Sequence, residues 1–321
     1  MCAQTFGPYI LCMWKVLSEI ELPELPLAGA EALEEPALRV SLGSVAQPPA
    51  AGFVVTDGGD VLLRIPVLGD FFVSRTGDEV IVQAQANVDP LQLRNCLYGS
   101  VLATVCYLRG LFPLHGSSVL MHDAAIAFSG QSGAGKSTLA MAVARRGHPL
   151  LSDDVCALDL RDTAHPMLRP AIPRTKLFAD TIDHFQLGAS DLYTHTARGS
   201  KGHFSMAGAL ADTRVGRALP LRAVYMLDAR DQDQVSLVAL RGKNCFSFWM
   251  QQAHRSVIGY KLGFRQRIFQ QVSVLASTVP VYLLRRPRRL SALESTVQLL
   301  EQGPFGIPSE PVPFAKSGRV A

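Results

Sequence analysis

The first part of the chain alternates apolar and polar residues over short stretches, a pattern typical of β-strands. Turn-forming sequences separate these stretches at residues 57–60 and 76–78, and a proline-rich, acidic segment over 24–36 indicates a loop. We therefore predict a β-rich region over residues 1–88. Its expected strands are 9–16, 38–45, 52–56, 61–67, 71–75 and 80–83.

The pattern changes at Asp89 and Pro90, which suit the N-cap and the first position of a helix. From there, apolar runs of strand length alternate with amphipathic runs of helix length, so we predict an α/β (α+β) domain over residues 89–302. Ser291 and Glu294 form the pattern of a capping box before the last helix. Residues 303–321 are rich in Pro and Gly, and we predict a flexible tail. The expected helices are 91–108, 136–146, 246–257, 264–277 and 291–302, and the expected strands are 117–121, 124–128, 150–155, 221–227, 235–240 and 279–284.

Composition excludes several classes of protein. The 321 residues are 48% hydrophobic and 18% charged, which is typical of a globular protein. The net charge of +4 is not gathered in a basic stripe, so we expect no nucleic-acid partner. None of the six cysteines forms a C-x-x-C pair, which favours a reducing cytoplasm over a disulfide framework. We also expect neither a signal peptide nor a membrane span, because no long apolar run or cationic leader occurs.

One motif carries specific chemistry. The run Gly130-Gln131-Ser132-Gly133-Ala134-Gly135-Lys136-Ser137-Thr138 contains G-x-x-x-x-G-K-S between an expected strand and an expected helix. Glycines let backbone N–H groups approach phosphates closely, and the helix directs its positive end at them. Lys136 would contact the β and γ phosphates, and the Ser137 hydroxyl would bind Mg²⁺. The motif therefore predicts a site for ATP and Mg²⁺.

Two acids follow unusually soon after this loop. Asp153 and Asp154 lie at the end of the next expected strand, where one could bind the metal ion while the other accepts a proton from an attacking hydroxyl. The sequence does not assign the two roles. His115 precedes a strand expected beside the loop, so it would lie at the same sheet edge and could orient a carboxylate or stabilise charge.

Further candidates come from basic residues downstream. Arg174, Lys176 and Lys201 could neutralise phosphate charge, although each also fits a solvated loop. The glycine-flanked stretch around Lys201 could be a flap that closes over substrate.

Residues 114–116, 130–137 and 146–155 together resemble the catalytic domain of HPr kinase/phosphorylase, a bacterial enzyme that phosphorylates a serine of a protein. The resemblance implies a P-loop kinase fold of the HPr kinase/phosphoenolpyruvate carboxykinase type. It also implies that His115, Asp153 and Asp154 are catalytic. Residues 18–25, 219–225 and 279–284 are similar to HPr kinase-related kinases of peptide-biosynthesis clusters, some of which phosphorylate the C-terminal serine of lasso-peptide precursors.

The sequence departs from this family in one place. HPr kinases have a signature resembling E-x-R-G-x-G after the paired aspartates, whereas this chain has Pro170-Ala171-Ile172-Pro173-Arg174-Thr175-Lys176-Leu177. HPr itself and the phosphorylase back-reaction are therefore not expected. HPr kinase is hexameric, but the different N-terminal region leaves open whether this chain forms a homo-oligomer.

The leading hypothesis is an ATP-dependent kinase acting on a serine of a peptide or protein, such as the precursor of a ribosomally made peptide. A small-molecule kinase with free serine as acceptor, and a catalytically silent nucleotide-binding regulator, stay open as alternatives. Lys136, Ser137, both aspartates and His115 favour an enzyme over a regulator, because a protein that only binds a nucleotide needs no proton acceptor.

Overall fold

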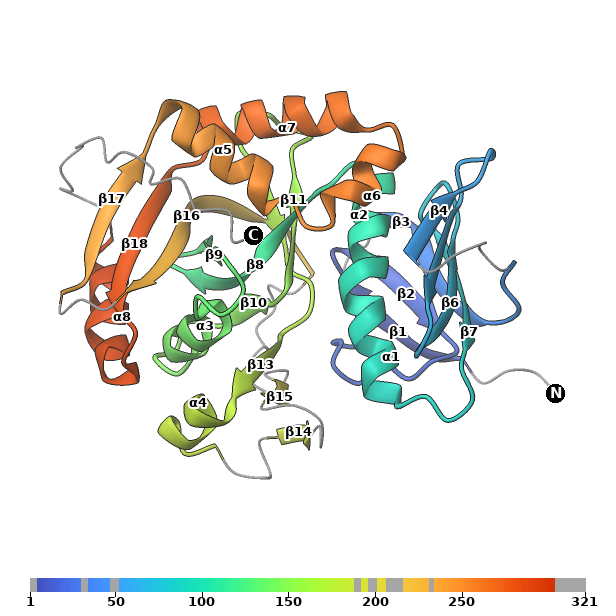
Figure 1. Cartoon of the computed structure of the whole chain (residues 1–321), viewed down its shortest axis with the longest axis horizontal. Coiled ribbons are helices and arrows are strands. Elements are labelled where there is room, and N and C mark those ends of the chain that lie inside the picture. Colours follow the sequence, from blue (N-terminus) through green and yellow to red (C-terminus); the bar gives the residue numbers. More distant parts are fainter. Residues whose placement is uncertain are drawn as a thin grey trace, which may run out of the picture.

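The computed structural model describes residues 5–29, 34–46, 52–187, 192–195, 201–205, 216–230 and 234–303. Within this part, the chain forms a seven-stranded sheet, a larger mixed sheet with helices on its faces, and a small three-stranded sheet (Figure 1). The β-rich N-terminal region and the mixed α/β class are confirmed. Of the predicted tail at 303–321, only Gly303 belongs to the described residues.

The N-terminal sheet has the strand order β1-β2-β3-β7-β6-β5-β4. The single strand predicted over 9–16 is wrong, because Cys12 and Met13 have φ values of 52° and 69° and turn the chain into a hairpin. The bounds are β1 (Phe6–Leu11), β2 (Trp14–Ser18), β3 (Glu34–Leu42), β4 (Gly52–Val55), β5 (Val61–Ile65), β6 (Gly69–Val73) and β7 (Glu79–Ala84).

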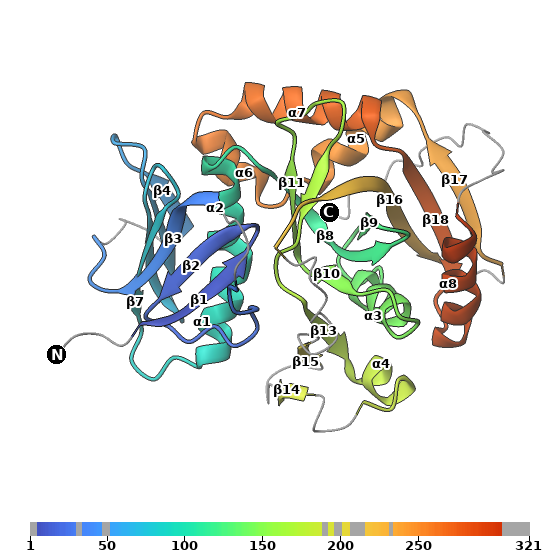
Figure 2. The same cartoon turned by 180° about the vertical axis from the view of Figure 1, so that it is seen from behind.

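A long helical segment follows this sheet and separates it from the larger sheet (Figures 1 and 2). It consists of α1 (Pro90–Cys96), a π-helical turn (Leu97–Val101) and α2 (Leu102–Leu108). The predicted N-cap is confirmed, since Leu91 N donates to Asp89 Oδ1 at 3.0 Å. Apolar residues of the N-terminal sheet, these helices and strand β11 (Val155–Asp159) share one core. The division into domains at residues 88 and 89 therefore stays a prediction.

The larger sheet has the order β10-β8-β11-β12-β16-β18-β17, with β9 pairing with β8 and β16. Strand β9 is antiparallel to β8 and parallel to β16, and all its residues are buried. The bounds are β8 (Phe112–Met121), β9 (Ala124–Ser129), β10 (Leu150–Ser152), β11 (Val155–Asp159), β12 (Met167–Arg169), β16 (Leu219–Arg230), β17 (Ser236–Leu240) and β18 (Val281–Pro287).

Three sequence predictions need correction in this part. The strand predicted over 150–155 is interrupted at Asp153 and Asp154, which separate β10 from β11. The helix predicted over 246–257 is two helices, because Ala253 is extended, with ψ 109°, and Arg255 is left-handed, with φ 51°. Ser291 and Glu294 form no capping box, since a 3₁₀ turn (Leu290–Ala292) precedes α8 and no side chain caps that helix.

Helices α3, α5, α7 and α8 pack around the larger sheet, α6 lies beside α2 and α7, and β13 to β15 form the small sheet beside α4 (Figure 1). No helix among the described ranges is long and apolar enough to cross a membrane. The bounds are α3 (Lys136–Ala144), α4 (Ala179–His184), α5 (Gly242–Gln252), α6 (Ser256–Lys261), α7 (Arg265–Thr278), α8 (Leu293–Gln302), β13 (Arg174–Phe178), β14 (Leu192–His195) and β15 (Lys201–Ser205).

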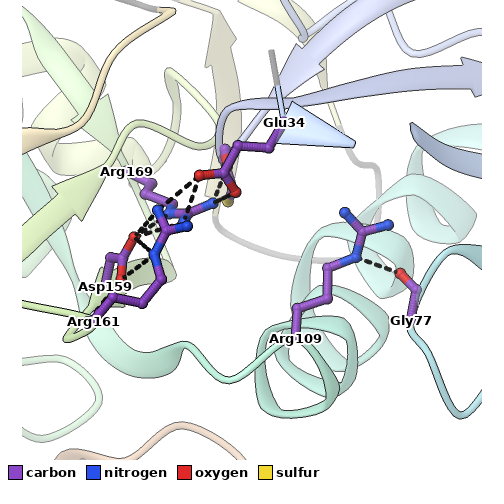
Figure 3. Close-up of polar contacts among 7 residues, drawn as sticks. Glu34, Gly77, Arg109, Asp159, Arg161 and Arg169 are labelled. Carbon is purple, nitrogen blue, oxygen red and sulfur yellow. Dashed lines mark hydrogen bonds and ion pairs between the residues drawn. The ribbon is translucent and has the colours of Figure 1, made fainter. Parts of the chain in front are cut away.

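An ion-pair network joins the N-terminal sheet to the larger sheet (Figure 3). The buried guanidinium of Arg169 in β12 lies 2.7 Å from Glu34 of β3 and 2.6 Å from Asp159 of β11. The exposed Arg161 contacts the same two carboxylates from the solvent side. The network ties both parts together at the end of β11, the strand that follows the paired aspartates.

Candidate functional site

The predicted phosphate-binding loop, residues 130–135, connects β9 to α3, as the motif requires. Gly130 and Gly135 have φ values of 141° and 89°, which favour glycine. A Cβ at Gly135 would also collide with the buried guanidinium of Arg286, which lies directly behind the loop. Lys136 Nζ donates to the carbonyl oxygens of Gly130 and Gln131 at 3.0 and 3.1 Å. The lysine ammonium is thus held along the loop.

The outer part of the loop is open to a ligand. Gln131, Ser132 and Gly133 are exposed, Ala134 is half-buried, and the inner Thr138 is buried with its hydroxyl 3.4 Å from that of Thr181. Since α3 begins at Lys136, its first backbone N–H groups and positive dipole end lie at the loop. This arrangement fits an anionic group such as a phosphate.

Asp153 lies against this loop, and its carboxylate accepts four hydrogen bonds. Oδ1 accepts from the hydroxyls of Ser117 at 2.5 Å and Ser137 at 3.0 Å. Oδ2 accepts from the Thr175 hydroxyl at 3.0 Å and from the backbone N–H of Lys176 at 3.3 Å. Strand β8, helix α3 and strand β13 therefore all fix the position of Asp153, which is only 8% exposed.

The pair of Ser137 and Asp153 fits a magnesium ion. Their oxygens lie 3.0 Å apart, and adjacent ligand oxygens in an octahedral Mg²⁺ shell with bonds of about 2.1 Å lie about 3 Å apart. A carboxylate and a hydroxyl are also ligand types that Mg²⁺ takes beside nucleotide phosphates. The chemistry and spacing of these two side chains thus agree with the metal site predicted from the loop.

Asp154 faces a different environment from Asp153. Its backbone is left-handed, with φ 78°, a conformation that non-glycine residues adopt rarely and often at functional sites. His115 Nδ1 lies 3.1 Å from the Asp154 carbonyl oxygen and 3.4 Å from its carboxylate Oδ1. Lys176 Nζ lies 3.9 Å from the other carboxylate oxygen, and the Asp154 side chain is 38% exposed. Asp154 is therefore open to a second reactant.

His254 belongs to the same cluster but was missed by the sequence analysis. Its ring stacks on that of His115, with centroids 5.0 Å apart and planes at 20°. The backbone N–H of His254 donates to Pro113 O at 2.8 Å, which fixes the segment after α5 against β8. His254 lies far down the chain in no recognisable motif, so only the tertiary fold reveals this contact.

The charges around Asp154 set the ionisation of the cluster. Burial and the nearby Lys136 lower the pKa of His115, and burial lowers the pKa of His254 to about 4. Burial raises the pKa of Asp154, but positive charges, led by Lys176, outweigh this effect and lower it. At neutral pH the cluster therefore contains an ionised Asp154 beside two neutral imidazoles.

The structure separates the three basic candidates. Lys176 lies at the site through both its ammonium and its backbone N–H. Arg174 is buried and bonds to Glu24 at 3.2 Å and Asn95 at 2.6 Å, so its guanidinium joins β13 to the N-terminal part and is not free for a phosphate. Lys201 begins β15, opposite Phe178 of β13, but its side chain and the preceding residues of the predicted flap lie outside the described part.

No family model matches the chain. A stretch of 121 residues is 28% identical to HPr kinase/phosphorylase from Exiguobacterium sp. and covers 36% of this chain and 38% of that relative. A solved structure, the Hpr(Ser) kinase/phosphatase from Coxiella burnetii, matches with a TM-score of 0.31 and 12% identity over 59% of this chain and 91% of that one. The sequence match confirms that the chain resembles HPr kinase/phosphorylase over about a third of its length.

Proposed function

We propose that this protein is a serine kinase that transfers the γ-phosphoryl group of ATP to a serine hydroxyl of a peptide or protein. The observation that carries the proposal is the pairing of the phosphate loop with two differently placed carboxylates. Asp153 is bonded to Ser137 of the loop, while Asp154 lies beside His115 with more than a third of its side chain exposed. A nucleotide-binding regulator would not need the second, open carboxylate.

Their contacts support different roles for the two aspartates. Asp153 and Ser137 would hold Mg²⁺, because their oxygens already lie at the spacing that one cation needs. The bound Mg²⁺ would supply positive charge to the phosphate oxygens. Ser117 and Thr175 hold the Asp153 carboxylate in place from either side. Lys136 would leave the loop carbonyls for the β and γ phosphates.

Asp154 would act as the general base. The serine oxygen attacks the γ-phosphorus, a new P–O bond forms, and the bond from that phosphorus to the β–γ bridging oxygen breaks to release ADP. The serine proton passes to the Asp154 carboxylate. A carbonyl oxygen can only accept a hydrogen bond, so the contact of His115 Nδ1 with Asp154 O requires a proton on Nδ1. That N–H also faces Oδ1 and orients the carboxylate.

Nucleotide binding would strengthen Asp154 as a base. Lys136 is one of the positive groups that lower the pKa of Asp154. When phosphates neutralise Lys136, this effect weakens and the pKa of Asp154 rises toward that of a more effective proton acceptor. The proposed acid–base chemistry is therefore coupled to the presence of ATP.

The proposed acceptor is a serine of a peptide, with the C-terminal serine of a lasso-type precursor as one candidate. The test is to incubate the protein with ATP, Mg²⁺ and an array of serine peptides, including some that end in serine, and with free serine. Mass spectrometry should find a gain of one phosphate on peptides, and Lys136→Ala should abolish it. Asp57→Asn, in an exposed turn of the N-terminal sheet, is the matched control and should transfer normally. Full transfer by Lys136→Ala would refute the proposal.

A further inference from the structure

We propose that the cleft between the N-terminal sheet and helix α6 receives the acceptor peptide, and that Arg255 binds a carboxylate of this peptide close to the acceptor serine. This inference rests on the proposed kinase function and adds the acceptor class to it. The cleft has a volume of about 610 Å³. Phe53, Leu63 and Ile65 line one wall, and Arg255, Val257 and Ile258 line the other.

The cleft reaches His115, which contacts the proposed base Asp154. Both His115 and His254 line it, and His115 Nδ1 lies 3.4 Å from Asp154 Oδ1. Behind His115, the Ser129 hydroxyl bonds to the His115 carbonyl oxygen at 2.6 Å, and the phosphate loop begins at the next residue, Gly130. His115 and Asp154 thus lie between the cleft and the phosphate loop, which is where an acceptor hydroxyl must arrive.

The size of the cleft favours a peptide over a free amino acid. Pockets of about 300–1,000 Å³ typically enclose ligands much larger than a single serine. The walls also offer apolar surface, since Val257 is 58% exposed and the ring of Phe53 is half-buried. Lys261 Nζ lies 4.7 Å from the centroid of the Phe53 ring, a cation–π contact between the two sides. Several residues of an extended chain can therefore contact both walls.

The charge of the cleft indicates what the peptide carries. Among the described residues, no Asp or Glu lines the cleft, whereas Arg64 and Arg255 do. The positive charge of Arg64 is paired with the carboxylate of Asp70, to which its guanidinium donates hydrogen bonds of 2.8 and 3.0 Å. Arg255 is exposed and forms no ion pair within the described ranges, so its positive charge faces the cleft without a partner. A carboxylate is the complementary group, because it can accept two hydrogen bonds from one guanidinium.

The backbone holds Arg255 in this position. It precedes α6 with φ 51°, and its carbonyl oxygen accepts from Ile258 N at 2.8 Å. The preceding residue is His254, which stacks on His115. Arg255 therefore lines the cleft beside His254, so a carboxylate bound to it would lie near the cluster that receives the acceptor serine.

The test is a charge reversal read on an array of serine peptides. The array holds peptides with Glu next to serine, peptides that end in serine with a free carboxylate, the same peptides amidated, and peptides with Lys next to serine. Binding is measured in a Lys136→Ala background and transfer in the otherwise unchanged protein. We expect binding to favour carboxylate peptides by about tenfold, the size of one charge-assisted hydrogen bond. The two carboxylate arms show whether a side chain or the chain end supplies the group.

Arg255→Glu should abolish this preference and favour the Lys peptides, while Arg217→Glu, an exposed arginine outside the cleft, should leave it unchanged. Val257→Trp should weaken binding of every peptide by filling the cleft. The inference is wrong if Arg255→Glu keeps the wild-type preference, or if no peptide binds. If Arg255→Glu transfers phosphate with an unchanged peptide preference, the kinase function is supported and the role of the cleft is refuted. If the wild type binds carboxylate peptides selectively but transfers no phosphate, the role of the cleft is supported and the kinase function is refuted.

Discussion

Arg169 offers the sharpest test of how the N-terminal sheet is attached to the rest of the protein. Its side chain is 3% exposed and lies 2.7 Å from Glu34 and 2.6 Å from Asp159, whose side chain is 7% exposed. Replacing Arg169 by Met removes the buried cation and leaves Asp159 buried with only the outer Arg161 as a partner (Figure 3). Loss of one partner from a buried ion pair costs about 3–5 kcal/mol of unfolding free energy when the other charge is left unpaired. Because Arg161 still bonds to Asp159, this is the upper limit expected for Arg169→Met.

Arg161 provides a matched control in the same network. It contacts the same two carboxylates at 2.7 Å, but its side chain is 71% exposed. Exposed ion pairs contribute about 0.2–1 kcal/mol, since solvent screens them and long side chains lose freedom when they pair. Arg161→Met should therefore lower the unfolding free energy by no more than about 1 kcal/mol.

Urea denaturation at neutral pH measures both changes. Trp14 in the N-terminal sheet and Trp249 in α5 are both buried, so retaining one tryptophan at a time reports unfolding of each part. If the network joins the parts, the two probes unfold together in the wild type and separately in Arg169→Met. Equal losses of stability in Arg169→Met and Arg161→Met would refute the reasoning, because burial would then make no difference.

Three further predictions follow from individual contacts. Gly135→Ala should reduce ATP affinity by about tenfold, because alanine is strained at φ 89° and its Cβ would displace the Arg286 guanidinium. Titration calorimetry measures this, and unchanged affinity would contradict the loop geometry. Asp153→Asn should weaken ATP binding in the presence of Mg²⁺ but not in EDTA. An equal loss of affinity under both conditions would show that Asp153 is not a ligand of Mg²⁺. Burial would raise the pKa of Asp159, but hydrogen bonds from Arg161 and Arg169 outweigh it and lower the pKa. Ionised Asp159 therefore stabilises the folded protein above a pH of about 4. This stabilisation is lost as the pH falls through the lowered pKa that Asp159 has in the folded protein. As the pH falls below about 4, the urea midpoint of unfolding should decrease in the wild type and decrease less in Arg169→Met. An equal decrease in both proteins would show that Arg169 does not lower the pKa of Asp159.

The conformation of the predicted phosphate loop could be derived from the sequence because it is local. The residues from Gly130 to Thr138 adopt their conformation through glycine φ values and the start of one helix, and both are encoded in consecutive residues. Asp153 and Asp154 could be placed near the loop because only a helix and a short strand separate them from it. Their different surroundings could not be predicted, since Thr175 and Lys176 come from a strand that the sequence pattern did not reveal.

Contacts between distant parts of the chain account for the other differences. Arg174 resembles a phosphate ligand in sequence, but its partner Glu24 lies 150 positions away, so no local pattern shows the pair. His254 reaches His115 because the segment after α5 bridges to β8. The break between α5 and α6 lies at the extended Ala253 and the left-handed Arg255, neither of which is a residue type that ends a helix.

The central claim is that Asp154, and not Asp153, accepts the proton of the acceptor serine. The most direct measurement is single-turnover transfer of phosphate from γ-labelled ATP to an acceptor peptide by Asp154→Asn at saturating ATP and Mg²⁺. We predict a rate lower by about 10²–10⁴-fold, the usual contribution of a general base, with unchanged affinity for ATP. Transfer at the wild-type rate, or a loss explained entirely by weaker ATP binding, would contradict the account.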